Sequence, residues 1–157
     1  MISLEKKIIG VAALKKKLSA LRKAKKTIAF TNGCFDLMHL GHVTYLQKAK
    51  KGSRVLVVGL NSDKSISRIK GPSRPIVAQK SRAAVLAALA CVDFVVIFNE
   101  DTPYELIKAV KPDVLVKGAD WKGKAVVGQD LAKKLELITY IKGFSTTNII
   151  DKIKKHG

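Results

Sequence analysis

Apolar residues gather along the chain in five short runs, each about as long as a β-strand. The runs cover residues 27–30 (TIAF), 54–60 (RVLVVGL), 92–98 (VDFVVIF), 113–117 (DVLVK) and 137–141 (LITYI). Within them Val, Ile and Leu follow one another with little of the polar alternation that marks a strand with one face in water. The pattern therefore predicts five strands that are buried on both faces of a sheet.

Between these runs lie stretches whose apolar residues are spaced as on a helix. They cover residues 40–51, 79–90, 103–110 and 128–135, and a last one begins near Thr146 and runs into the C-terminus. Strands that alternate with helices are typical of a parallel sheet covered by helices on both faces. We therefore expect an α/β fold with a doubly wound, five-stranded parallel sheet.

The residues before the first predicted strand have a different pattern. Apolar side chains recur here at helical spacing with lysines between them, at Leu4, Ile8, Val11, Leu14, Leu18 and Leu21. We expect an amphipathic helix over about residues 4–25, within a segment 1–26 that packs on a single domain covering residues 27–157. A helix that lies on a membrane surface is the alternative.

Charge narrows the classes of partner. Lys and Arg number 30 against 12 Asp and Glu, which gives a net charge of +18. Such an excess suits an anionic partner, and nucleic acid is one class. A nucleic-acid-binding module, however, would place base-stacking aromatic side chains among its basic residues. Aromatic residues make up only 6% of the chain, so we expect a solvated basic surface and keep nucleic acid as a distant alternative.

Cysteine content and the N-terminal sequence bear on the cellular compartment. Cys34 and Cys91 are the two cysteines, too few for a disulfide framework or a cysteine-based zinc site. The first residues lack the long apolar run of a signal peptide, and no stretch is long enough to span a membrane. We therefore expect a cytoplasmic protein.

The segment 31–42 (TNGCFDLMHLGH) follows the first predicted strand, where doubly wound sheets bind ligands. Gly33 permits a tight turn or a close approach of the backbone to a ligand. His39 and His42 flank Gly41 at the start of the next helix, where free N–H groups and the helix dipole favour an anion. By position alone the histidines could bind phosphate, cap the helix or bind zinc, although zinc needs further ligands and the remaining histidine is His156.

The segment GCFDLMHLGH resembles the G-x-F-D-x-x-H-x-G-H signature of the cytidylyltransferase-like nucleotidyltransferases, which have a Rossmann-like fold. Four further segments resemble family elements: NSDKSISRIKGPSRPI, QKSRAAVLAALACVD, VKGADWKGK and GFSTTNII. The resemblance covers residues from about 27 to 155. Together these motifs are most similar to those of the adenylyltransferases that form ADP-heptose in bacteria.

The resemblance implies an enzyme that transfers AMP from ATP to D-glycero-β-D-manno-heptose 1-phosphate, giving ADP-heptose for lipopolysaccharide core. It implies Mg²⁺ with the ATP, a separate heptose 7-phosphate kinase as a partner, and a homodimer or higher oligomer. A cytidylyltransferase that acts on glycerol 3-phosphate or another phosphorylated alcohol is the alternative. Such glycerol-specific enzymes carry an arginine three residues before the glycine of G-x-S-T-T, where this chain has Tyr140. This difference favours ATP.

The resemblance also assigns roles to individual residues. Catalysis would depend on His39, His42 and Lys70. Nucleotide binding would involve Thr31, Asn32, Gly33, Cys34, Phe35, Gly41, Arg82, Lys117, Gly118, Asp120, Ser145, Thr146 and Thr147. Substrate contacts would come from Asp36, Arg74 and Trp121.

Several of these residues have an ordinary structural alternative. Ser145 belongs to a residue type that commonly caps helices, and Arg82 fits an exposed helix arginine. Asp36 suits either the outer shell of a metal ion or the cap of a turn. Trp121 could equally pack against the domain.

The basic segment after the second predicted strand is expected to be a loop. Gly71, Pro72 and Pro75 rule out a regular helix around Lys70. We expect this loop to be mobile without nucleotide and to close when Lys70 and Arg74 meet the triphosphate.

Overall fold

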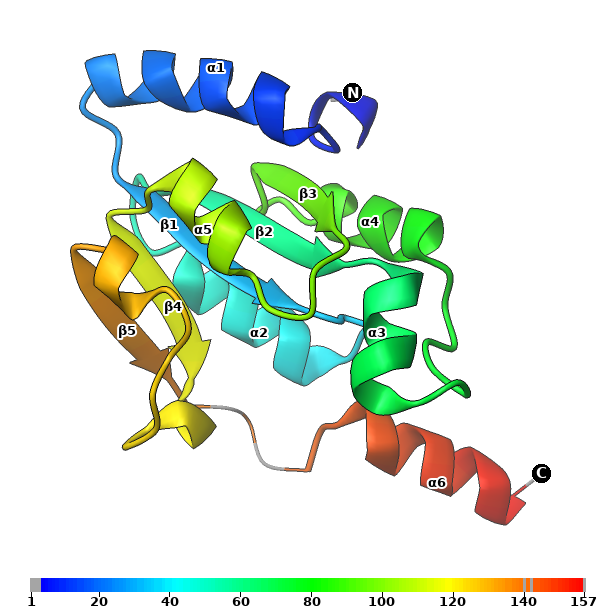
Figure 1. Cartoon of the computed structure of the whole chain (residues 1–157). Helices are drawn as coiled ribbons and strands as arrows, with labels where there is room; N and C mark the ends of the chain where they lie inside the picture. The colour runs from blue at the N-terminus through cyan, green and yellow to red at the C-terminus, as the bar shows by residue number, and fades with distance from the viewer. Residues whose placement is uncertain (1–3, 140, 142, 157) are drawn as a thin grey trace.

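The computed structural model describes residues 4–139, 141 and 143–156. Its strands are β1 (Ile28–Gly33), β2 (Val55–Asn61), β3 (Phe94–Phe98), β4 (Val114–Gly118) and β5 (Lys134–Ile138). They form one parallel sheet in the order β3-β2-β1-β4-β5 (Figure 1). The chain leaves β1 toward β2 on one side and returns to β4 on the other, so the predicted doubly wound fold is confirmed.

Helices cover both faces of this sheet. They are α1 (Val11–Lys23), α2 (Leu40–Ala49), α3 (Asp63–Lys70), α4 (Gln79–Ala88), α5 (Tyr104–Val110) and α6 (Thr146–His156). Buried residues of α2 and α4 join one core cluster, and those of α1 and α5 join the other. The sheet therefore lies between two apolar layers, and α6 adds no residue to either cluster.

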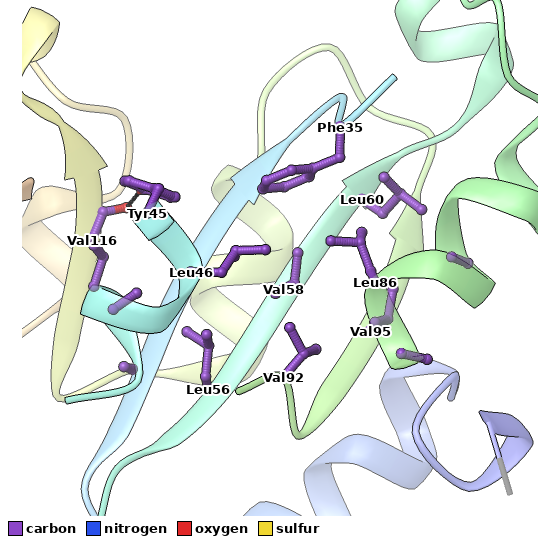
Figure 2. Packing of buried hydrophobic residues seen from close by; sticks show 14 of the residues in the cluster. Phe35, Tyr45, Leu46, Leu56, Val58, Leu60, Leu86, Val92, Val95 and Val116 are labelled. Carbon is purple, nitrogen blue, oxygen red and sulfur yellow. Dashed lines mark hydrogen bonds between the residues drawn. The ribbon is translucent and has the colours of Figure 1, made fainter. Parts of the chain in front are cut away.

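Strand β2 shows why a continuous apolar run was needed. All seven of its residues are buried. Leu56, Val58 and Leu60 pack toward α2 and α4 (Figure 2), whereas Val55 and Val57 pack toward α1 and α5. Because alternate side chains enter opposite layers, the positions from Val55 to Leu60 carry no polar side chain, and the polar Asn61 comes only at the end of the strand.

The N-terminal prediction is correct for α1 and wrong for the residues before it. Leu14 and Leu18 are fully buried in the core, so the apolar face of α1 packs on the domain as expected. Residues 4–10 are not part of this helix. A short 3₁₀ turn, Leu4–Lys6, leads into a segment in which Ile8 bridges to Val95 of β3. This segment covers the edge of the sheet, and the helix begins only after Gly10, which has extended backbone angles.

The helix predicted over residues 128–135 is wrong. Only a 3₁₀ turn, Gln129–Leu131, forms there, and β5 begins at Lys134, three residues before the predicted start. As an edge strand, β5 pairs with β4 alone and alternates polar with apolar residues, which obscured it in the sequence. Arg54 donates two hydrogen bonds, of 3.2 and 2.8 Å, to the carboxylate of Glu136 in this strand.

The prediction of a loop around Lys70 is wrong for the first half of that segment, which is helical. Helix α3 begins after Ser62, whose hydroxyl accepts a hydrogen bond from the amide of Ser65 at 3.1 Å. It ends at Lys70, and Gly71 adopts a φ of 96° that continues no helix. The glycine and prolines therefore terminate a helix that already carries Lys70 at its last position.

None of the helices in the described part of the chain combines the length and the apolar character needed to cross a membrane.

Candidate active site

A cleft of about 670 Å³ opens at the carboxyl ends of the strands. The predicted site residues that line it are Asn32, Gly33, Cys34, Phe35, Asp36, His39, His42, Lys70, Arg74, Lys117, Gly118, Trp121, Ser145, Thr146 and Thr147. Thr31, Gly41, Arg82 and Asp120 are not among the lining residues. Residues from four strand ends and the starts of two helices thus meet in one place, as the parallel topology requires.

His39 and His42 form a stacked pair at the start of α2. Their ring centroids are 3.8 Å apart and the rings are inclined by 21°. His39 is the N-cap residue of α2 by its backbone, and His42 follows in the first turn. Nδ1 of each ring is buried without a hydrogen bond of good geometry among the described residues, although the backbone of Leu37 still acts on His42. The ring edges that line the cleft, rather than these buried atoms, can therefore reach a ligand.

Burial keeps both imidazoles neutral at pH 7. It lowers the pKa of His42 to about 4, with smaller contributions from His39 and Lys70. Burial likewise lowers the pKa of His39. A polyanion in the cleft would favour the charged form and raise both pKa values. In the free protein the pair is therefore a set of neutral donors that an anion can charge.

Two residues of the histidine segment support the pair rather than reach into solvent. The ring of Phe35 lies 5.2 Å from the ring of His42, and Phe35 itself is buried. Gly41 allows close packing, since an added Cβ would lie 3.0 Å from Nδ1 of His39 and 3.4 Å from Cβ of Phe144. The glycine of the motif is therefore needed for space around the histidine.

Thr31 anchors α2 from beneath the cleft. Its hydroxyl oxygen lies 2.8 Å from the hydroxyl of Tyr45, which donates to the carbonyl of Val116 at 3.1 Å (Figure 2). The three residues come from β1, α2 and β4. Thr31 therefore fixes the helix that carries the histidines to two central strands.

Asp36 anchors the chain that follows α3. Its carboxylate accepts hydrogen bonds from the amides of Ile76 and Val77 at 2.9 to 3.0 Å. Nε of Arg74 lies 2.9 Å from Oδ2 of Asp36, an ion pair without the alignment of a hydrogen bond. Of the roles left open by the sequence, the structure favours the structural one, because protein groups already surround this buried carboxylate.

The side chain of Arg82 does not lie at the cleft, where the sequence placed it for nucleotide binding. The side chain is fully buried, and its guanidinium binds protein groups on all sides. Nη1 donates to the carbonyls of Cys34 and Asn61 at 2.6 and 2.9 Å, and Nε donates to the carbonyl of Val77 at 2.8 Å. Nη2 donates to Oδ1 of Asp63 at 2.7 Å. The guanidinium therefore joins the ends of β1 and β2 to α3 and to the segment before α4.

The segment between α3 and α4 is held at several points. Besides the contacts of Asp36, the hydroxyl of Ser67 donates to the carbonyl of Arg74 at 2.7 Å. The amide of Arg74 donates to the carbonyl of Gly71 at 3.1 Å. Arg74 is thus tied to Asp36, whereas Lys70 lines the cleft from the end of α3. The predicted closing motion of this segment stays a prediction.

Lys117 lies near the end of β4 and is almost completely buried. Its ammonium donates to Oδ1 of Asn32 and lies 5.4 Å from the ring centroid of Trp121. Burial lowers the pKa of Lys117 to about 8, and Asp120 opposes this shift. Asp120 itself is exposed.

The start of α6 closes another side of the cleft. Ser145 accepts a hydrogen bond from the amide of Asn148 at 3.0 Å, the geometry of an N-cap. Thr146 and Thr147 also line the cleft. Gly143 precedes them with a φ of 88°. The predicted capping role of Ser145 is therefore present together with its position at the cleft.

Cys34 also lines the cleft, and burial raises the pKa of its thiol. This shift favours the protonated form, so the sulfur is not activated as a nucleophile.

The cleft also contains residues that the sequence did not single out: Tyr45, Asn61, Ile69, Asp101, Thr102, Pro103, Val127 and Phe144. Asp101 and Thr102 lie just beyond β3, so the rule that sites form after parallel strands could have identified them. Ile69 and Phe144 gave no chemical signal. The described residues contain no group of three or more His, Cys, Asp or Glu side chains that could hold a metal ion.

Comparison with known proteins gives three kinds of match. Residues 30–152 match the protein family described as Cytidylyltransferase-like. The chain is 57% identical over 145 residues to "Bifunctional protein HldE" of Helicobacter pylori, covering 92% of this chain and 31% of that protein. It is 56% identical over 150 residues to the protein of the same name from Campylobacter fetus, covering 96% and 32%. The chain thus spans about a third of the length of these curated relatives.

Two solved structures are also similar. A lipopolysaccharide core biosynthesis protein from Thermoplasma volcanium matches with a TM-score of 0.59 and 28% identity, over 75% of this chain and 98% of that one. A pantoate-beta-alanine ligase from Francisella tularensis matches with a TM-score of 0.63 over 94% of this chain and 77% of that one. Because the second pair is only 18% identical, it bears on the fold alone.

Proposed function

Because the chain belongs to the cytidylyltransferase-like family of nucleotidyltransferases, we propose that it transfers AMP from ATP to D-glycero-β-D-manno-heptose 1-phosphate. The products are ADP-heptose and pyrophosphate, and the pathway is lipopolysaccharide core synthesis. The stacked histidine pair in the cleft at the strand ends is the observation that carries the reaction class. The high identity to the HldE proteins and the likeness to a lipopolysaccharide core biosynthesis protein support the acceptor.

In this reaction an oxygen of the sugar phosphate attacks the α-phosphorus of ATP, the bond from that phosphorus to the bridging oxygen breaks, and pyrophosphate leaves. No nucleophile from the protein is required. The protein has to align two phosphates and stabilise the charge that builds up on the phosphoryl oxygens. This demand matches a cleft lined by neutral and charged N–H donors.

His39 and His42 would donate hydrogen bonds to phosphate oxygens of the nucleotide. Lys70, at the end of α3, would add a positive charge near the β- and γ-phosphates. The amides and hydroxyls of Thr146 and Thr147 at the start of α6 suit another phosphate oxygen. The backbone of residues 32–35 would lie along the nucleotide, and Gly118 would face its ribose.

Mg²⁺ would arrive with ATP and neutralise part of the phosphate charge. Both carboxylate oxygens of Asp36 accept amide hydrogen bonds and one pairs with Arg74, so this residue is poorly suited to bind the ion directly. Phosphate oxygens and water are therefore its expected ligands.

The name of the relatives, "Bifunctional protein", indicates a second activity beside this one in those proteins. We propose a heptose 7-phosphate kinase as the partner activity that precedes this reaction. A homodimer or higher oligomer and a cytoplasmic location belong to the same proposal. Tyr140, on which the preference for ATP over CTP was based, lies outside the described residues.

Pyrophosphate release tests the proposal. The purified protein is assayed with ATP and CTP against heptose 1-phosphate, glycerol 3-phosphate and other sugar 1-phosphates, with Mg²⁺ in constant excess. We expect the highest kcat/KM with ATP and heptose 1-phosphate. Equal or greater efficiency with CTP, or with glycerol 3-phosphate, would replace this assignment with the cytidylyltransferase one.

A further inference from the structure

Lys117 and Asn32 form a polar pair in the floor of the cleft. The ammonium donates to the amide oxygen of Asn32, and only 7% of Lys117 is exposed. Both residues line the cleft, together with Trp121. An almost buried cation therefore faces the space in which the substrates meet.

This pair lies on the face of the sheet opposite the histidines. A Cβ built on Gly59 would meet Cβ of Asn32 at 3.3 Å and Cδ2 of Leu106 of α5 at 3.1 Å, so Asn32 points toward α5. Trp121 also packs against the α1 and α5 cluster. The histidines, in contrast, rise from α2 on the other face. The cleft therefore has the neutral histidine donors on one side and the ammonium of Lys117 on the other, separated by the edge of the sheet.

The charge of Lys117 is not balanced within the described part of the chain. No carboxylate lies within ion-pair distance of its ammonium there, and its hydrogen-bond acceptor is a neutral amide. Asp120 is the charged group that acts on it, and only through space. A buried cation without a counter-ion is unfavourable unless an anion binds beside it. The lowered pKa of about 8 agrees with such a site.

We propose that Lys117, oriented by Asn32, binds the phosphate group of the acceptor sugar phosphate on the α5 side of the cleft. This inference rests on the proposed function, because a transfer between two phosphates needs a cationic group for each. The proposed function assigns His39, His42, Lys70 and the start of α6 to the triphosphate. The ring of Trp121, beside the ammonium, offers an apolar face to the sugar.

The first test separates the two substrates kinetically. Lys117→Met keeps the length and apolar stem of the side chain but removes its charge. We expect the KM for the sugar phosphate to rise about tenfold or more, since a hydrogen bond between two charged groups is lost. The KM for ATP should stay within about twofold. Lys122→Met, on an exposed neighbour outside the cleft lining, is the matched control.

The second test uses pH. In the wild type the KM for the sugar phosphate should rise as pH increases from about 8 to 9.5, because the ammonium loses its proton. Lys117→Arg stays charged over this range, so its KM should remain flat. An unchanged KM for the sugar phosphate in Lys117→Met, or an increase confined to ATP, overturns the proposal.

A binding measurement distinguishes this inference from the proposed function. Inorganic phosphate is titrated by calorimetry into protein saturated with a non-hydrolysable ATP analogue and Mg²⁺, at pH 7. Weaker binding to Lys117→Met than to Lys122→Met supports the subsite, even if the wild type accepts none of the heptose phosphates tested. Equal binding to both variants counts against it.

Discussion

The surface of the cleft and the layer directly beneath it use polar residues in opposite ways. At the surface, the stacked rings of His39 and His42 line the cleft. Beneath it, the guanidinium of Arg82 and the carboxylate of Asp36 are surrounded by protein groups. Ring edges that line the cleft are available to a ligand, whereas the paired groups below hold the segments that carry them. Two residues of one family motif thus have different roles: His39 faces the cleft, whereas Asp36 holds the protein segments beneath it.

The comparison also explains how neutral histidines can serve an anion. Burial keeps both stacked rings uncharged in the free protein, so no repulsion between two cations has to be overcome. The layer below keeps the rings in place. The negative charge of the bound nucleotide would then favour protonation of the imidazoles. Preorganised donors of this kind stabilise a transition state without reorganisation.

The largest expected effect comes from removing a surface donor. His39→Ala or His42→Ala should lower kcat by roughly 10²-fold or more, as for one donor to a developing oxyanion. The free energy of unfolding should change little, because both rings line the cleft and neither belongs to an apolar core cluster. Stopped assays of pyrophosphate release and a thermal melt check both parts. Near wild-type kcat in both variants would rule out the phosphate-binding role.

Removing Arg82, which anchors the layer beneath the cleft, should mainly lower stability. Arg82→Met leaves the carbonyls of Cys34, Asn61 and Val77 without their donor, so the free energy of unfolding should fall by about 2 kcal/mol. Urea denaturation measures this loss. Lys80→Met, in the same helix, is the control, and equal stability of the two variants would contradict the anchoring role.

Lys70 tests the comparison at the border between the cleft surface and the layer beneath it, because this residue ends helix α3 and also lines the cleft. Lys70→Ala should reduce kcat by about tenfold, while binding of AMP, which lacks the β- and γ-phosphates, changes less. Trypsin cleavage after Lys70 or Arg68 should slow when Mg–ATP is bound, because the segment is then held on both sides. Identical cleavage rates with and without Mg–ATP would show that the segment does not respond to nucleotide.

A further expected effect is a dependence of stability on pH. The pKa of His42 is about 4 in the folded protein and near 6.5 in a free side chain. As pH falls from 6.5 toward 4, the unfolded chain therefore binds the proton first, and the folded state loses stability. His42→Asn should weaken this decline, measured as melting temperature against pH. An identical pH profile for wild type and variant would mean that His42 is not responsible.

Part of the cleft could be predicted because its signals are local. His39, His42 and the start of α6 lie in short motifs directly after strands, and a parallel sheet brings strand ends together. The same reasoning failed for Arg82, whose chemistry suits phosphate as well as carbonyl groups. Only the packing of α4 against the ends of β1 and β2 decides that its guanidinium points inward.

By itself the sequence determined the sheet, the two apolar layers and the histidine pair, since apolar runs and motif spacing are properties of neighbouring residues. Tertiary structure decided the edge strand β5, the buried partners of Asp36 and Arg82, and the face of the sheet to which Lys117 points. Each of these depends on contacts between segments far apart in the chain. A lysine at a strand end has the same local sequence pattern whichever groups surround it. Whether a carboxylate balances its charge depends on the groups that the fold brings near it.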